Sequence, residues 1–184
     1  MSEYDAFLRE QVRQAYDRSY KQGTWAAVWQ ARRRGSNQLR DLTAITAGQM
    51  VRSQHAAGTH AVPLSAIRGS EGRCADFDAA FHPRQQHTRS RWEGIAQAML
   101  REVRLPPVEL IQLGDSYFVR DGHHRISVSR ALGQVDIDAI VTVWTVDGAV
   151  PSAEPVTARR AWLPAVFARR GGDGTPRHAL AAGR

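Results

Sequence analysis

The chain has 184 residues, of which 42% are hydrophobic and 8% aromatic, so it has enough apolar surface for one folded domain with extensions. No stretch reaches the roughly 20 apolar residues of a membrane span, the first ten residues are charged where a secretory signal would be apolar, and the single Cys74 excludes an internal disulfide and a cysteine-rich zinc cage. We therefore expect a cytoplasmic protein with no membrane contact, stabilised by packing.

The net charge of +7 is unevenly distributed along the chain. Residues 1–60 hold nine basic and five acidic side chains, residues 61–147 hold ten and eleven, and residues 148–184 hold six and two. Basic arms on a neutral centre favour sequence-independent contact with DNA through its phosphates. Of the 25 basic residues, 24 are arginine, which indicates a bias in composition. Such a bias, with no role beyond solubility, explains the excess of positive charge equally well.

We expect residues 1–60 to form an N-terminal helical arm. Apolar residues recur every three or four positions between Tyr4 and Tyr20, which predicts a helix that ends at Gly23. A second helix is predicted to begin at Thr24 and to pack one apolar face on the core or on a second copy of the chain. That face consists of Trp25, Val28 and Trp29.

The rest of the arm carries weaker signals. The three arginines at 32–34 suit the negative end of a helix dipole as well as they suit a polyanion contact. Residues 37–50 predict a weak helix, and residues 56–60 are small and polar enough to be a linker. We therefore place a domain boundary near residue 60.

Residues 61–147 predict a mixed α+β core. Thr88 can cap a helix whose inner face includes Trp92, and Gly114 with Asp115 joins two β-rich runs in the manner of a hairpin. The elements expected are a strand at 61–67, a polar loop at 69–83, a helix from 88, a hairpin of 108–113 with 117–120, a helix at 123–132 that stops at Gly133, and a strand at 137–143.

Residues 148–184 are predicted to be a tail rich in proline, glycine and arginine. Its composition is typical of chain without a packed core. One apolar segment around Trp162 is the exception, because it has the spacing of an amphipathic turn that can dock.

The segment Asp121-Gly122-His123-His124-Arg125 lies where a predicted strand passes into a predicted helix. A helix start offers free N–H groups and the positive end of the dipole to an anion. Gly122 would let a ligand approach the backbone, and Arg125 offers a fork of donors to phosphate oxygens. Asp121 is either the N-cap, a metal-bridged phosphate contact or a base for a hydroxyl nucleophile. The adjacent His123 and His124 are not expected to face inward together.

The run from Val62 to Val143 resembles the ParB/sulfiredoxin superfamily. The motifs that carry the resemblance are V-P-L-x-x-I, F-D, L-P-P-V-E-L, Y-F-V-R-D-G-H-H-R and I-D-A-x-V. The resemblance implies a ParB/sulfiredoxin-like core in which the loop from Gly122 to Arg125 binds nucleotide phosphates, so that CTP, ATP or ADP is the expected ligand, with Mg²⁺ as a companion ion. His123 and His124 would contact the phosphates, and His124 would also be a catalytic candidate.

A second cluster is expected on the loop that faces the phosphates in this superfamily. Arg73 resembles the arginine that precedes a Phe-Asp pair in partition proteins, here Phe77 and Asp78. Glu71 stands where a catalytic carboxylate would act on a phosphate acceptor. The same charges are also typical of a solvated salt-bridge network. We predict no metal site, since the spacing of the loop histidines is unspecific for zinc.

Departures from the superfamily patterns leave several functions open. Sulfiredoxin has its catalytic cysteine where this chain has His123, which argues against thiol chemistry at Cys74. The G-E-R-R of partition proteins is replaced, so the acidic residue of CTP turnover is missing, and no DNA-reading helix-turn-helix follows. The loop is closer to the D-G-T-H-R of serine-kinase members. The alternatives are a nucleotide-dependent switch or homodimer, a small-molecule kinase, NTPase or nuclease, and an interaction protein with a vestigial pocket.

Overall fold

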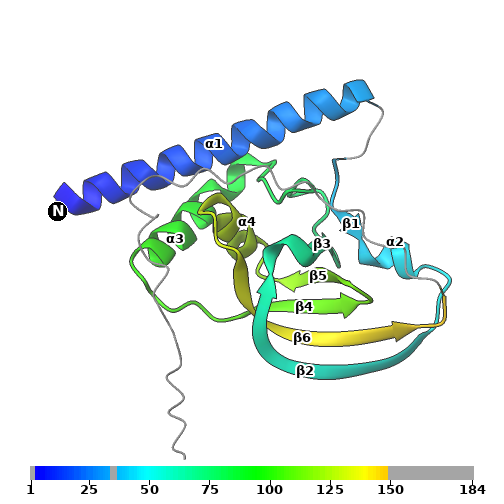
Figure 1. The fold of residues 1–184 in the computed structure, drawn as a ribbon. Coiled ribbons are helices and arrows are strands. Elements are labelled where there is room, and N and C mark those ends of the chain that lie inside the picture. Colours follow the sequence, from blue (N-terminus) through cyan, green and yellow to red (C-terminus); the bar gives the residue numbers. More distant parts are fainter. Residues whose placement is uncertain (1–2, 34–36, 149–184) are drawn as a thin grey trace, which may run out of the picture.

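A six-stranded mixed sheet forms the centre of the protein, with three of the helices gathered on one side of it (Figure 1). The computed structural model describes residues 3–33 and 37–148, and it confirms the α+β class. The strands are β1 (Arg40–Asp41), β2 (Val51–Pro63), β3 (Ile67–Ser70), β4 (Val108–Leu113), β5 (Ser116–Asp121) and β6 (Asp136–Val146), in the spatial order β1-β3-β5-β4-β6-β2.

The predicted hairpin is confirmed as β4 and β5, and the last predicted strand is confirmed as β6. The turn places Gly114 at φ 58°, and Leu113 pairs with Ser116 across it. Since β3 and β5 run parallel, their carboxyl ends lie at the same edge of the sheet, with Ser70 paired to Val119. The loop that follows β3 and the helix that follows β5 therefore begin side by side.

The predicted linker at residues 56–60 is wrong, because these residues belong to β2. This strand pairs antiparallel with β6 from Val51 opposite Val146 to Pro63 opposite Asp136. Small polar residues suit this edge strand since all of its side chains except that of Val62 are exposed. The domain boundary expected near residue 60 falls inside this strand. The weak helix expected at 37–50 is replaced by β1 and the short α2 (Leu42–Thr46).

The two helices predicted before residue 34 are one continuous helix, α1 (Glu3–Arg33). Gly23 does not end it. A Cβ atom at this position would lie 2.9 Å from the Cβ of His82, so the glycine allows the helix to pack closely on the loop after β3. Trp25, Val28 and Trp29 are 63%, 54% and 60% exposed, and they therefore do not pack on the described core.

Three helices form a layer against the sheet. α1 crosses α3 (Arg89–Leu100) and α4 (His123–Ala131), as Figure 1 shows. The predicted inner face of α3 is confirmed: Trp92 is fully buried and donates from Nε1 to Ser127 Oγ of α4 at 2.9 Å. The helix–helix core is made of Val12, Tyr16, Trp92, Ala96 and Val128.

α4 ends where expected, with Gly133 at φ 75°. Of the described helices, none is long and apolar enough to cross a membrane. The tail predicted from residue 148, including the segment around Trp162, lies outside the described residues from 149 onward.

Candidate functional site

A small pocket opens where the loop after β3, the first turns of α3 and the start of α4 meet. Its volume is about 40 Å³. Pockets that enclose a whole small molecule measure about 300–1,000 Å³, so this one fits a single phosphate-sized group. It is lined by Arg73, Arg91, Ile95, Asp121, Gly122, His123, His124 and Arg125. The fold thus brings Arg73 to the Asp121–Arg125 segment, as the sequence predicted.

The start of α4 presents uncapped backbone donors to this pocket. Gly122 is the N-cap residue at φ 99°, and Ile126 N donates to its carbonyl at 3.0 Å. No side chain of the described residues caps the helix, so the N–H groups of His123, His124 and Arg125 have no partner within it. Such groups, together with the dipole, favour an anion.

Glycine is required at position 122 for reasons other than ligand approach. The left-handed backbone conformation is costly for other residues. A Cβ atom would also lie 2.5 Å from Cγ1 of Val108. The glycine therefore lets α4 begin directly above β4, which sets the position of the free N–H groups.

Asp121 is not the N-cap that one interpretation of the sequence predicted. It is the last residue of β5, its side chain is 62% exposed, and its Oδ2 accepts from Arg125 Nη2 at 2.6 Å. The guanidinium of Arg125 also donates from Nη1 to the carbonyls of Pro106 and Pro107, the latter at 2.9 Å. Arg125 thus fastens the segment before β4 to the first turn of α4.

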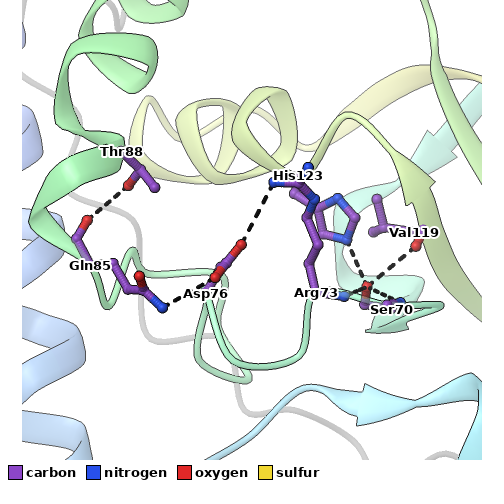
Figure 2. A network of polar contacts seen from close by, with 8 residues as sticks. Ser70, Arg73, Asp76, Gln85, Thr88, Val119 and His123 are labelled. Atoms are coloured by element: carbon purple, nitrogen blue, oxygen red, sulfur yellow. Dashed lines mark hydrogen bonds and ion pairs between the residues drawn. The ribbon is translucent and has the colours of Figure 1, made fainter.

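Ser70 connects the loop after β3 to the start of α4, as Figure 2 shows. The N–H groups of Gly72 and Arg73 donate to its Oγ at 3.1 and 3.0 Å. His123 Nε2 lies 2.7 Å from the same oxygen, and the Val119 carbonyl lies 3.4 Å from it. Because the two donated bonds occupy the oxygen's lone pairs, the hydroxyl proton goes to the nearer acceptor, His123 Nε2.

His123 is consequently held neutral. An imidazole that accepts at Nε2 carries its proton on Nδ1. Burial, followed by the charge of Arg73, lowers the pKa of His123 from 6.5 to about 4. The ring stacks on Phe77 with centroids 6.0 Å apart. His123 is therefore an oriented neutral side chain at neutral pH.

His124 is buried as well, so the expectation that the two histidines would not face inward together is wrong. His123 and His124 are 5% and 6% exposed. Both can be buried because Phe77 reaches between them, stacking on one ring and meeting the other edge-on at 5.2 Å. His124 Nδ1 is a buried polar atom without a hydrogen-bond partner in the described structure. Burial and the charges of Arg91 and Arg73 lower the pKa of His124 to about 4.

Two arginines supply the positive charge of the pocket. The Arg73 guanidinium rises beside His123 in Figure 2, and within the described part of the chain it makes only a long contact, 3.7 Å, with Asp76. Its side chain is 56% exposed and can turn toward a ligand. Arg91 reaches the pocket from α3, one turn before Ile95. The sequence analysis missed Arg91, although its spacing of four from Ile95 was a signal that both share a face.

Glu71 is not part of the pocket lining. Its carboxylate pairs with Arg120, at 2.8 Å from Nε and 3.3 Å from Nη2. This pairing agrees with the salt-bridge interpretation of the loop. The catalytic role expected for Glu71 has no geometric support in the described contacts.

The remaining groups of the loop after β3 have structural partners. Asp78 is 1% exposed and accepts from the N–H groups of Ala80 and His82 and from His82 Nδ1 at 2.9 Å.

Within 3–33 and 37–148 no three His, Cys, Asp or Glu residues are grouped as metal ligands. Burial and then Asp41 raise the pKa of Cys74, which disfavours its thiolate.

Comparisons with known proteins give a likeness to solved structures alone. No protein-family model matches the chain, and no curated protein does. Among solved structures, the chain is similar to a crystal structure of sulfiredoxin from Arabidopsis thaliana, with 18% sequence identity and a TM-score of 0.35. The similarity covers 45% of this chain and 82% of that chain. The functional proposal therefore rests on the geometry of the site.

Proposed function

We propose that the protein binds one phosphoryl group of a nucleotide, CTP, ATP or ADP, in the pocket at the start of α4. The observation that carries this proposal is the convergence of three kinds of unused donor on one small space. These are the uncapped N–H groups of α4, the guanidinium groups of Arg73 and Arg91, and the imidazole of His124, whose Nδ1 is buried without a partner among the described residues. A polar side chain that is buried without a partner costs free energy, which a bound ligand would recover.

The residues have different tasks in this proposal. Arg73 and Arg91 supply charge-assisted hydrogen bonds to the anion. His124 contributes a neutral imidazole whose protonated nitrogen can donate. Arg125 is already committed to Asp121, Pro106 and Pro107, so it acts as a positioning residue that holds the first turn of α4 in place.

The size of the pocket limits what it can recognise. About 40 Å³ accommodates a phosphoryl group but not a base or a sugar. Mg²⁺ in nucleotide sites is held by one or two carboxylates together with phosphate oxygens. Asp121 is the one carboxylate in the described lining, and it is paired with Arg125. The proposed function is therefore the binding of a phosphoryl group.

Calorimetric titration with inorganic phosphate, CTP, ATP and ADP, with and without Mg²⁺, tests this proposal. Arg73→Ala and Arg91→Ala should each lower affinity by about 10-fold or more, since a hydrogen bond to a charged group is worth about 1.5–3 kcal/mol. Arg104→Ala is the matched control, because Arg104 is exposed and lies outside the pocket lining. Cys74→Ser should also leave affinity unchanged. Equal affinity in wild type and both pocket variants would contradict the proposal.

A further inference from the structure

The outer face of α1 carries an apolar and aromatic pattern that the described fold leaves exposed. Tyr4, Phe7, Trp25, Val28 and Trp29 are each between 54% and 63% exposed. Single exposed apolar side chains are ordinary, but several on one helix face indicate an interaction surface. The opposite face is already used, since Leu8, Val12 and Tyr16 are buried against the body. The exposed face is thus available while α1 stays anchored.

The exposed residues follow a heptad pattern. A coiled coil has two core positions in every seven residues, and here these positions begin at Tyr4 and at Phe7. The first series consists of Tyr4, Gln11, Arg18 and Trp25. The second series consists of Phe7, Gln14, Lys21 and Val28. They form one seam, which we call the α1 seam, with apolar side chains at both ends and polar side chains in the middle. Trp29 flanks its C-terminal end.

The α1 seam is self-complementary when two copies run antiparallel. The two helices can be aligned so that the numbers of any two facing residues add to 32. Each residue of the first series then faces a residue of the second series in the other copy. Tyr4 then lies opposite Val28, and Phe7 lies opposite Trp25. The polar middle pairs in the same way, Gln11 with Lys21 and Gln14 with Arg18. A two-fold axis at position 16 relates the two helices, as a closed dimer with identical surfaces requires.

The charges beside the seam favour the antiparallel direction. The first half of α1, residues 3–16, has a net charge of −1, because Glu3, Asp5 and Glu10 stand against Arg9 and Arg13. The second half, residues 17–33, has a net charge of +3, because Arg18, Lys21, Arg32 and Arg33 stand against Asp17. In an antiparallel pair the half of each helix with a net charge of −1 lies beside the half of its partner with a net charge of +3. A parallel pair would place like charges together, which destabilises the contact.

We propose that the α1 seam binds the α1 seam of a second copy of this chain, giving an antiparallel two-fold dimer. Each end of the contact is an aromatic cluster formed by Tyr4 and Phe7 of one copy with Trp25, Val28 and Trp29 of the other. The pocket at α4 is built from other faces, so dimerisation and phosphate binding are separate properties.

Sedimentation velocity of the full chain over a range of concentrations tests the dimer. Phe7→Glu should raise the dissociation constant at least 10-fold, because the charge would lie in an aromatic cluster. Val135→Glu is the matched control, since Val135 is an apolar residue that is 79% exposed and lies between α4 and β6, outside the α1 seam. A wild-type chain that is monomeric at 100 µM would overturn the proposal, as would equal dissociation constants for the two variants.

Disulfide trapping tests the direction and register. In a Cys74→Ser background, mixing the Phe7→Cys chain with the Trp25→Cys chain should give a covalent heterodimer under mild oxidation. A chain that carries both cysteines cannot close on itself, because 18 residues of helix separate them by about 27 Å. Each single-cysteine chain alone should stay uncrosslinked. Efficient crosslinking of Phe7→Cys to itself would show a parallel pair and overturn the antiparallel arrangement.

Discussion

At the scale of single residues, contiguous site residues were predictable and those that tertiary structure brings in were not. The segment from Gly122 to Arg125 stood out because a glycine before a helix start is a local signal. The burial of both histidines was missed, since it depends on Phe77, which is far away in sequence. Ser70 was missed for the same reason: only the parallel pairing of β3 with β5 places it against His123.

The Asp121–Arg125 ion pair leads to a prediction about affinity. Asp121→Asn should leave the free energy of unfolding within about 1 kcal/mol of wild type, because an ion pair whose carboxylate is 62% exposed contributes little. Removing the negative charge from the pocket rim should strengthen phosphate binding about 3-fold, as less than 1 kcal/mol of repulsion is relieved. The measurements are urea unfolding and phosphate titration. Loss of Mg²⁺-dependent nucleotide binding would instead identify Asp121 as a metal-bridged contact.

The two buried histidines predict a pH-dependent stability. Their pKa values fall from 6.5 to about 4 on folding, so the unfolded chain binds more protons than the native protein between these values. Their stabilising contribution is complete above pH 6.5 and is lost as the pH falls toward 4. Each should lower the free energy of unfolding by up to about 1.4 kcal/mol per pH unit.

Urea unfolding at pH 7.0, 6.0 and 5.0 measures this slope. His124→Leu removes one of the two groups and should reduce the slope by about half. His55→Ala is the control for loss of a histidine, because His55 is exposed on β2, away from the two buried histidines. An identical slope in wild type and His124→Leu would show that His124 does not titrate differently in the two states.

At the scale of helices and strands, local signals predicted the elements that carry their own apolar pattern. The β4–β5 hairpin, α3 and α4 have clear turn residues and an inner face, and each was placed correctly. β2 has neither, and it exists because β6 supplies its hydrogen-bond partners along its whole length. The predicted helix end at Gly23 was wrong for a comparable reason. This glycine allows a close contact with His82 and does not end the helix.

At the scale of the whole molecule, charge distribution and fold give two surfaces with different tasks. The pocket at α4 concentrates positive charge at one point of the sheet edge, through Arg73, Arg91 and a helix dipole. α1 has a mixed surface, with basic groups balanced in part by Glu3, Asp5, Glu10 and Asp17. The described part of the arm, residues 3–33 and 37–60, carries a net charge of +3, and residues 149–184 carry +4.

DNA binding stays a prediction of the charge distribution, and it belongs to the whole molecule. We expect binding of duplex DNA to be independent of sequence and to weaken steeply with salt, because it depends on release of counterions from neutralised phosphates. Neutralising about four phosphates would give a slope near −3.6 for the logarithm of affinity against the logarithm of salt concentration. Fluorescence anisotropy with two unrelated duplexes between 50 and 200 mM salt measures both properties. A chain ending at Gly148 should show a much shallower slope, and an unchanged slope would place the contact on the folded body instead of the basic end.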